Sequence, residues 1–445
     1  MAGYESWSTQ DLISRIKDLE SRCETDGKDH GHVSSNIVRG SRSEPKQKKI
    51  KVQSSKRKFD FDKYQQKYVA FKFAYLGWHY NGLVTQDMPT ELPTVEEEIF
   101  KALIKTHLIS HPDECRFSRC GRTDKGVSAM GQVMALNVRS AFLKDRPSGE
   151  ADATTKELAW LEQLNGCLPP SIRILAYDDQ IAPTFDARFS CRKRHYKYLL
   201  APRVPGAAAL NRDAMNVACS YLVGDHDFRN FCKLDASKQI SNFHRTILRC
   251  EISDLIPPQS DTLADSSLGL YVLDLEGTAF LWHQVRCITA ILLLVGQGLE
   301  EPEVVRELLD ISKTPTKPIY EMADDWPLTL YDCDFGDQVN WKHSVQSQRI
   351  FERTFATLHE ARIKDAISSF MVDAAAISVN QEATKPGTNL GDGRIKVQAN
   401  YVPLMQRKRM ADVVTLNAAF AEKKERKMVE KRRLEVDPDV HMATT

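Results

Sequence analysis

The sequence predicts an α+β protein built from two mixed α/β halves with mainly antiparallel sheets. Three observations predict this class. Runs with the period-two alternation of half-buried strands recur through the middle of the chain. Amphipathic segments with helix-capping signals lie between those runs. This succession of strand and helix patterns occurs twice, once before and once after residue 185, so we expect two α+β units rather than one.

Length and composition fit a soluble globular protein of more than one domain. The chain has 445 residues, of which 42% are hydrophobic and 27% are charged. The longest apolar run, residues 288–295, is far shorter than the ~18 residues that a membrane helix needs. The N-terminal residues do not resemble a secretory signal. The net charge is +1, so any binding of nucleic acid is expected to depend on local basic patches.

Cysteine spacing gives no sign of a metal site. The chain has ten cysteines, and none belongs to a C-x-x-C pair. Cys115 and Cys120 lie close together, but neither histidine nor cysteine follows them at zinc-finger spacing. We expect reduced, mostly buried thiols in an intracellular protein, and no bound metal.

Composition divides the chain into four segments. Residues 1–63 are expected to form a basic, largely disordered tail, in which Ser8 or Thr9 could cap a short helix. Lysines and arginines crowd residues 46–58, as in a solvated linker, a nuclear localisation signal or an RNA-backbone contact. Residues 64–185 and 186–376 form the two halves. Residues 377–445 form a charged, partly disordered extension.

Each element of the first half has its own signal. Apolar and polar residues alternate over residues 68–75, which predicts a strand. Thr94 and Glu97 form a capping box before a helix with one apolar face. Two strands are expected over residues 116–120 and 131–138. A second capping box, Thr154 with Glu157, is expected to begin a helix that ends before Pro169-Pro170.

The second half repeats these patterns. The expected elements are a strand at 194–201, a helix at 211–223, strands at 246–255 and 268–275, an apolar helix at 282–295 and a long helix at 347–374. The helix at 282–295 is apolar on most faces, so we expect it to be buried.

One short run could carry chemistry, namely Arg119-Cys120-Gly121-Arg122-Thr123-Asp124-Lys125-Gly126. Asp-Lys-Gly is also ordinary turn chemistry, so the run could be a surface turn. However, Asp124 is a single acid among Arg116, Arg119, Arg122 and Lys125. A carboxylate surrounded by cations stays ionised and can be buried. Such a group can act as a nucleophile or a base.

The same run carries a family resemblance. Residues 120–129, followed by Gly131-Gln132-Val133, closely resemble the catalytic motif of TruA-type tRNA pseudouridine synthases. Four further stretches resemble the same family in the same order: Tyr75 to Gly82, Asp186 to Ser190 with Arg194 to Tyr198, Leu222 to Phe231, and Phe280 to Arg286. The resemblance implies the pseudouridine synthase fold, with a cleft between the two halves.

Two details resemble the eukaryotic branch of this family. They are the run Tyr75-Leu76-Gly77-Trp78 and the run Phe231-Cys232-Lys233-Leu234-Asp235. That branch modifies uridines 38 and 39 in the anticodon arm of tRNA. A close relative with broader tRNA and snRNA targets is the main alternative.

The resemblance also implies roles for individual residues. Asp124 corresponds to the catalytic carboxylate, and Arg286 to a cation facing it. Tyr196 corresponds to the tyrosine that stacks on the target base, although Tyr198 on the same run is an equally good core tyrosine. Arg122 corresponds to an arginine that helps to extrude the nucleotide from the RNA.

Further basic residues are expected to contact tRNA phosphates. They are Lys125 of the motif and a strip around Tyr196, made of Arg188, Arg192, Lys193, Arg194, His195 and Lys197.

The implied isomerisation needs neither a metal nor an organic cofactor. The resemblance further implies a homodimer that shares one tRNA, and we expect the protein in nucleus and cytoplasm, with no membrane partner. Two other functions fit the sequence less well. A carboxylate glycosidase needs a second acid near the first, and the motif supplies only one. An inactive RNA-binding scaffold would be expected to lose Asp124, Tyr196 or Arg286, and all three are present.

Overall fold

The computed structural model describes residues 59–145, 156–204, 208–256, 269–345, 347–376, 387–397 and 400–436, all within one compact unit that spans residues 59–445. The short helix expected in the N-terminal tail and the basic cluster at 46–58 lie outside these residues. The boundaries expected at residues 63, 185 and 376 stay predictions. Among the described residues, no helix combines the length and the hydropathy needed to cross a membrane.

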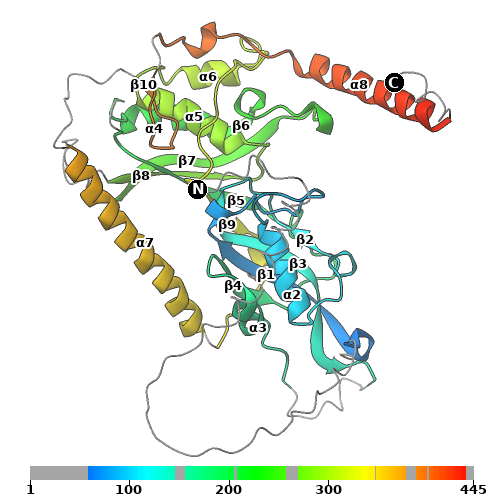
Figure 1. Ribbon diagram of the computed structural model, residues 1–445. Coiled ribbons are helices and arrows are strands. Elements are labelled where there is room, and N and C mark those ends of the chain that lie inside the picture. Colours follow the sequence, from blue (N-terminus) through cyan, green and yellow to red (C-terminus); the bar gives the residue numbers. More distant parts are fainter. Residues whose placement is uncertain are drawn as a thin grey trace, which may run out of the picture. The chain divides into compact units, whose positions relative to one another are not determined.

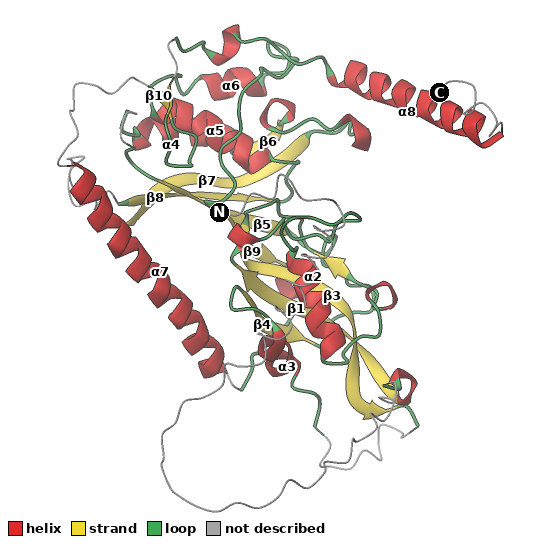
Figure 2. Ribbon diagram, in the orientation of Figure 1, coloured by secondary structure: helices red, strands yellow, loops and turns green. Residues whose placement is uncertain are grey.

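A nine-stranded sheet is the framework of this unit (Figure 2). The strands are β1 (Tyr64–Tyr75), β2 (Ser118–Arg119), β3 (Ser128–Leu143), β4 (Ile172–Asp178), β5 (Lys193–Leu200), β6 (Gly224–Asp227), β7 (His244–Ile256), β8 (Leu270–Gly277) and β9 (Leu328–Asp334). Their order is β4-β1-β3-β9-β5-β8-β7-β6, with β2 paired to β3. The β3–β9 pair is parallel, and the other described pairs of the sheet are antiparallel. This confirms the α+β class.

The structure describes several helices (Figure 1). They are α2 (Val95–Lys105), α3 (Trp160–Cys167), α4 (Arg212–Leu222), α5 (Gln284–Gly296), α6 (Val304–Leu309), α7 (Ser347–Ala376) and α8 (Val413–Val436). A small hairpin joins β10 (Gly387–Thr388) to β11 (Lys396–Val397). Figure 1 shows α4 and α5 against β7 and β8, whereas α2 and α3 cover the strands β1 to β4. Short 3-10 helices cover Phe61–Lys63, Gly77–His79, Pro112–Glu114, Arg229–Phe231, Ala236–Lys238, Gly336–Gln338 and Leu404–Gln406.

The two expected halves share one continuous sheet but have separate hydrophobic cores. The first core lies under α2 and α3 and includes Phe71 and Trp160. The second surrounds α5, which is buried along almost its whole length, as its apolar sequence predicts. Strand β9 joins them, because it belongs to the second half in sequence but lies between β3 of the first half and β5 of the second. Tyr196 on β5 packs against both cores.

The first half confirms one expected capping box and corrects the other. The Thr94 hydroxyl accepts a hydrogen bond from Glu97 N, and the Glu97 side chain accepts one from Thr94 N. The second box does not begin a helix, because α3 begins only at Trp160. Glu157 instead accepts hydrogen bonds from Ala141 N and the Ser140 hydroxyl on β3, while Thr154 lies outside the described residues.

The strand expected at residues 116–120 is shorter than predicted. Only Ser118–Arg119 form β2. Arg116 has a φ of 51°, in the left-handed region, so the chain turns there instead of extending.

Candidate active site

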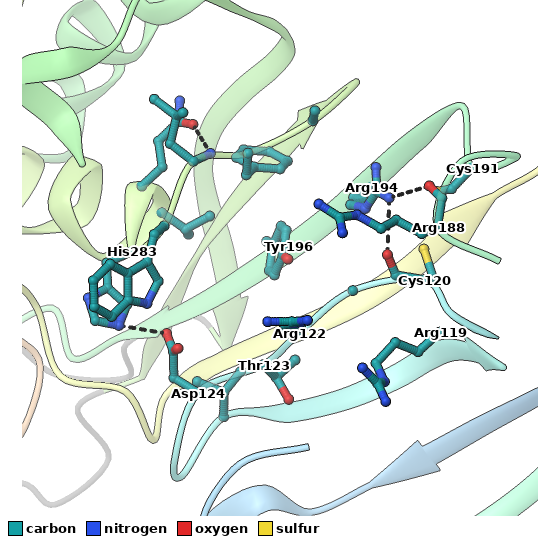
Figure 3. Close-up of a pocket in the computed structure, with 18 of the residues that line it drawn as sticks. Arg119, Cys120, Arg122, Thr123, Asp124, Arg188, Cys191, Arg194, Tyr196 and His283 are labelled. Carbon is teal, nitrogen blue, oxygen red and sulfur yellow. Dashed lines mark hydrogen bonds and ion pairs between the residues drawn. The ribbon is translucent and has the colours of Figure 1, made fainter. Parts of the chain in front are cut away.

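A cavity of about 850 Å³ opens where the two cores meet. Its walls come from residues 117–124 before β3, from residues 278–286 at the start of α5, and from Arg188, Arg194 and Tyr196 in and before β5. Both halves therefore contribute, and the volume suits a small organic ligand or one nucleotide. Figure 3 shows several of these side chains converging on the cavity.

Buried polar groups fix the loop that carries Asp124. Gln132 on β3 exchanges two hydrogen bonds with the backbone of Gly121, at 3.1 and 3.2 Å. The Thr123 hydroxyl lies 2.6 Å from the hydroxyl of Tyr75 on β1. Thr123 and Gln132 are both buried. The loop is therefore held on both sides of Arg122, so the Asp124 backbone is preorganised.

The run Tyr75 to Gly82 packs directly on the same loop. Gly77 N donates a hydrogen bond to the Ser128 hydroxyl at 2.9 Å. A Cβ at Gly77 would lie 2.0 Å from the Val127 carbonyl oxygen, so only glycine permits this approach. The two motifs, distant in sequence, thus form one structural unit.

The Asp124 carboxylate contacts His283. Oδ2 of Asp124 lies 3.1 Å from Nε2 of His283, and the His283 side chain is only 9% exposed (Figure 3). His283 immediately precedes α5 and has a φ of 58°, a left-handed conformation that is uncommon for a residue with a side chain. Such strain is often found at functional sites, and here it turns the imidazole toward Asp124.

Arg286 lines the same cavity but has another partner. Its Nε donates to the Ala323 carbonyl at 2.8 Å, and its Nη1 lies 3.5 Å from Oδ2 of Asp325. Among the described residues, no ion pair joins Arg286 to Asp124. Arg286 and Asp124 therefore line the same cavity, but the direct contact implied by the family resemblance is not present between these two described residues. Burial raises the pKa of Asp325, and the Arg286 charge opposes this effect.

Tyr196 lies in the wall of the cavity, where the two cores meet. Its ring is edge-on to that of Phe280, with centroids 5.0 Å apart. Burial raises the pKa of Tyr196, which keeps the phenol neutral. Tyr198 differs, because it is fully buried and donates to the Asp324 carbonyl. The choice of Tyr196 over Tyr198 as the residue in the site agrees with this placement.

The expected RNA-binding residues fall into different positions. Arg122 is exposed and lines the cavity, and within the described residues no ion pair or hydrogen bond engages its guanidinium. Arg188 is exposed at the cavity beside the ring of Phe189. Lys125 is exposed but does not line the cavity.

The guanidinium of Arg194 is hydrogen-bonded to backbone carbonyls of the protein. Its guanidinium donates to the carbonyls of Cys120, Arg188 and Thr278, at 3.0–3.1 Å. It therefore ties three chain segments around the cavity, and most of its donors are not free for phosphate.

His283 and Asp325 were not singled out from the sequence. His283 stands three residues before Arg286, inside the run that resembles the family. Because α5 begins at Gln284, this spacing is close to one helical turn, which could have indicated that both side chains face the same way. Asp325 had no comparable signal, because it lies in a loop with no motif.

Comparisons with known proteins identify the family of this chain. Residues 218–336 match the family model described as tRNA pseudouridine synthase. The chain is 44% identical to the tRNA pseudouridine(38/39) synthase of Saccharomyces cerevisiae, over 95% of this chain and 93% of that protein. It is 40% identical to the proteins of that name from Mus musculus, over 84% and 78% of the two chains, and from Homo sapiens, over 76% and 69%. The chain therefore belongs to the tRNA pseudouridine synthase family.

Proposed function

We propose that this protein isomerises uridine to pseudouridine at positions 38 and 39 in the anticodon arm of tRNA. The proposal is carried by one observation: Asp124, Tyr196 and Arg286, from both halves of the chain, line a single cavity. The positions are those in the name of the relatives that align with most of this chain.

The reaction is a rearrangement within one nucleotide. The bond between uracil N1 and ribose C1′ breaks, the base turns, and a bond forms between C5 and C1′. The proton on C5 is lost and N1 gains one, so nothing is added or removed overall. A cavity lined by both halves suits this chemistry, because it can hold the detached base while it turns. No cofactor is needed for this balance.

Asp124 is proposed as the catalytic carboxylate. It is partly exposed, at 32%, so it can reach a nucleotide while its backbone stays fixed. It could attack ribose C1′, attack uracil C6, or act as a base that first yields a glycal. Each path requires an ionised carboxylate held against the nucleotide.

Tyr196 and Arg286 are proposed to hold the target. A neutral, edge-packed phenol offers a flat face on which an extruded uracil can stack. The Arg286 guanidinium is fixed at one edge by Ala323 and remains charged when buried. It can therefore stabilise negative charge near Asp124 during the reaction.

Arg122 is proposed to help extrude the uridine. Extrusion of a base costs a few kcal/mol, so a group that fills its place or grips its phosphate is expected. An exposed guanidinium at the cavity rim, without a partner in the described part of the chain, suits that role. Arg188 is proposed to contact the RNA backbone beside it.

A homodimer that shares one tRNA, and a location in both nucleus and cytoplasm, are also proposed. The homodimer rests on the family resemblance, and the nuclear location rests on the basic cluster at residues 46–58. Light scattering of the purified protein, alone and with tRNA, would give a monomer mass if the dimer proposal is wrong.

The function is tested with the purified full-length protein and unmodified tRNA transcripts. One transcript carries uridine at 38 and 39, and matched transcripts carry cytidine at one or both positions. We expect pseudouridine only at the uridine-bearing positions, without added cofactor. Pseudouridine at many other tRNA or snRNA positions would favour the broader relative, and binding without any product would favour an inactive scaffold.

A further inference from the structure

Three cysteine side chains that are far apart in the sequence meet beside the Asp124 loop. The Sγ atoms of Cys120, Cys191 and Cys333 all lie within 4.8 Å of one another. Cys120 directly follows β2, Cys191 precedes β5, and Cys333 lies on β9. Figure 3 labels Cys120 and Cys191 near Arg194. The fold assembles this cluster, which is why cysteine spacing in the sequence gives no hint of it.

The separations suit a thiophilic metal ion. Zinc binds thiolate sulfur at about 2.3 Å, so neighbouring sulfurs of a tetrahedral site are about 3.8 Å apart. The three thiols therefore need to approach by about 1 Å or less, which small side-chain rotations supply. Cys120 and Cys333 are buried, whereas Cys191 is partly exposed. Cys120 and Cys191 also line the cavity, so a fourth position can be filled by water from that side.

The local charge also suits a metal thiolate. Binding of Zn²⁺ by three thiols releases three protons and leaves a net charge of −1 on the site. Arg194 supplies a cation there, because its Nη2 donates to the Cys120 carbonyl at 3.1 Å.

We propose that Cys120, Cys191 and Cys333 bind one Zn²⁺ ion through their three sulfurs. The ion would link Cys333 on β9 and Cys191 before β5 to Cys120, which directly precedes the Gly121–Asp124 loop. Its role is to hold that loop against the central strands, and it does not touch the nucleotide. The site is separate from the proposed isomerase function, and its test does not depend on activity.

The test measures metal in the full-length protein. Reduced protein is incubated with Zn²⁺ and freed of excess ion. Its zinc content is then measured by inductively coupled plasma mass spectrometry. We expect one zinc per chain. Cys120→Ser, Cys191→Ser and Cys333→Ser should each lose most of it, whereas the matched control Cys115→Ser should keep it, because Cys115 is a buried free thiol outside the cluster. Zinc-free wild type, or equal zinc in all variants, would overturn the proposal.

A second measurement avoids variants that fail to fold. Wild-type protein is titrated with Co²⁺ and its absorption is recorded. We expect thiolate-to-cobalt charge-transfer bands that saturate at one Co²⁺ per chain and vanish when Zn²⁺ is added. Absence of these bands in reduced, folded protein would show three packed thiols without a metal site, and so would reject the proposal.

Discussion

The imidazole of His283 lies against the catalytic candidate Asp124, with Nε2 and Oδ2 3.1 Å apart. This contact comes from a left-handed backbone at His283, just before α5. His283 is therefore a positioning residue that fixes the carboxylate of Asp124.

Replacing His283 should slow the chemical step more than it weakens tRNA binding. We expect His283→Asn to lower single-turnover rates about 10- to 100-fold, because asparagine accepts the left-handed backbone but is too short to reach Asp124. His283→Gln can place an amide nitrogen near the position of Nε2, so it should recover part of the rate. Equal rates for both variants and wild type would show that the contact has no role.

The pair Arg286–Asp325 predicts different effects for its two members. Arg286→Lys should lower the rate about 100-fold, because an ammonium cannot hold Ala323 and a charged group in one plane. Asp325→Asn should cost less than about 10-fold, because Arg286 keeps its contact to Ala323. Single-turnover assays compare them, and a larger loss for Asp325→Asn would place the essential carboxylate at Asp325 instead.

Arg122 and Lys125 form a matched pair of exposed cations on either side of Asp124. Arg122→Ala should reduce turnover at least about 10-fold, because base extrusion then lacks its replacement contact. Lys125→Ala should change turnover much less, because Lys125 does not line the cavity. Both should leave stability within about 0.5 kcal/mol of wild type. Similar turnover losses in the two variants would indicate general charge attraction rather than extrusion.

Glu157 makes stability depend on pH. Burial opposes its ionisation, but hydrogen bonds from Ala141 N and Leu158 N and the nearby Lys67 give a net lowering of its pKa. A carboxylate with a lowered pKa stabilises the folded state above its unfolded pKa, about 4.3, and this contribution is lost as pH falls through the folded value. Glu157→Gln should therefore cost about 1 kcal/mol at pH 7, and less below pH 4.

Denaturant unfolding at several pH values measures this difference. Glu301→Gln is the control, because it removes the same charge from an exposed position. A constant difference between wild type and Glu157→Gln across the pH range would contradict the ionic role of Glu157.

The α+β class and most elements followed from the sequence, because they depend on local patterns. The box at Thr94 and the apolar helix at α5 are examples. The parallel pairing of β3 with β9 did not follow, since Ser128 and Thr329 are neighbours only in the fold. The Glu157 box failed because a tertiary partner, β3, competes for the same carboxylate.

The site shows the same limit. The motif resemblance identified Asp124, Tyr196 and Arg286, and the structure places all three on one cavity. The motif resemblance could not predict which oppositely charged group each of these side chains contacts. Arg286 contacts Asp325 because a loop brings that carboxylate close. The sequence around Asp325 has no periodic pattern from which this contact could be predicted.

The most direct measurement is a single-turnover assay of Asp124→Ala and Asp124→Asn, paired with tRNA binding. Because phosphate contacts dominate RNA affinity, we expect binding within about threefold of wild type. Pseudouridine formation should fall by at least about 10⁴-fold in both variants. Substantial pseudouridine formation by Asp124→Ala, with binding intact, would contradict the assignment of Asp124 as the catalytic residue.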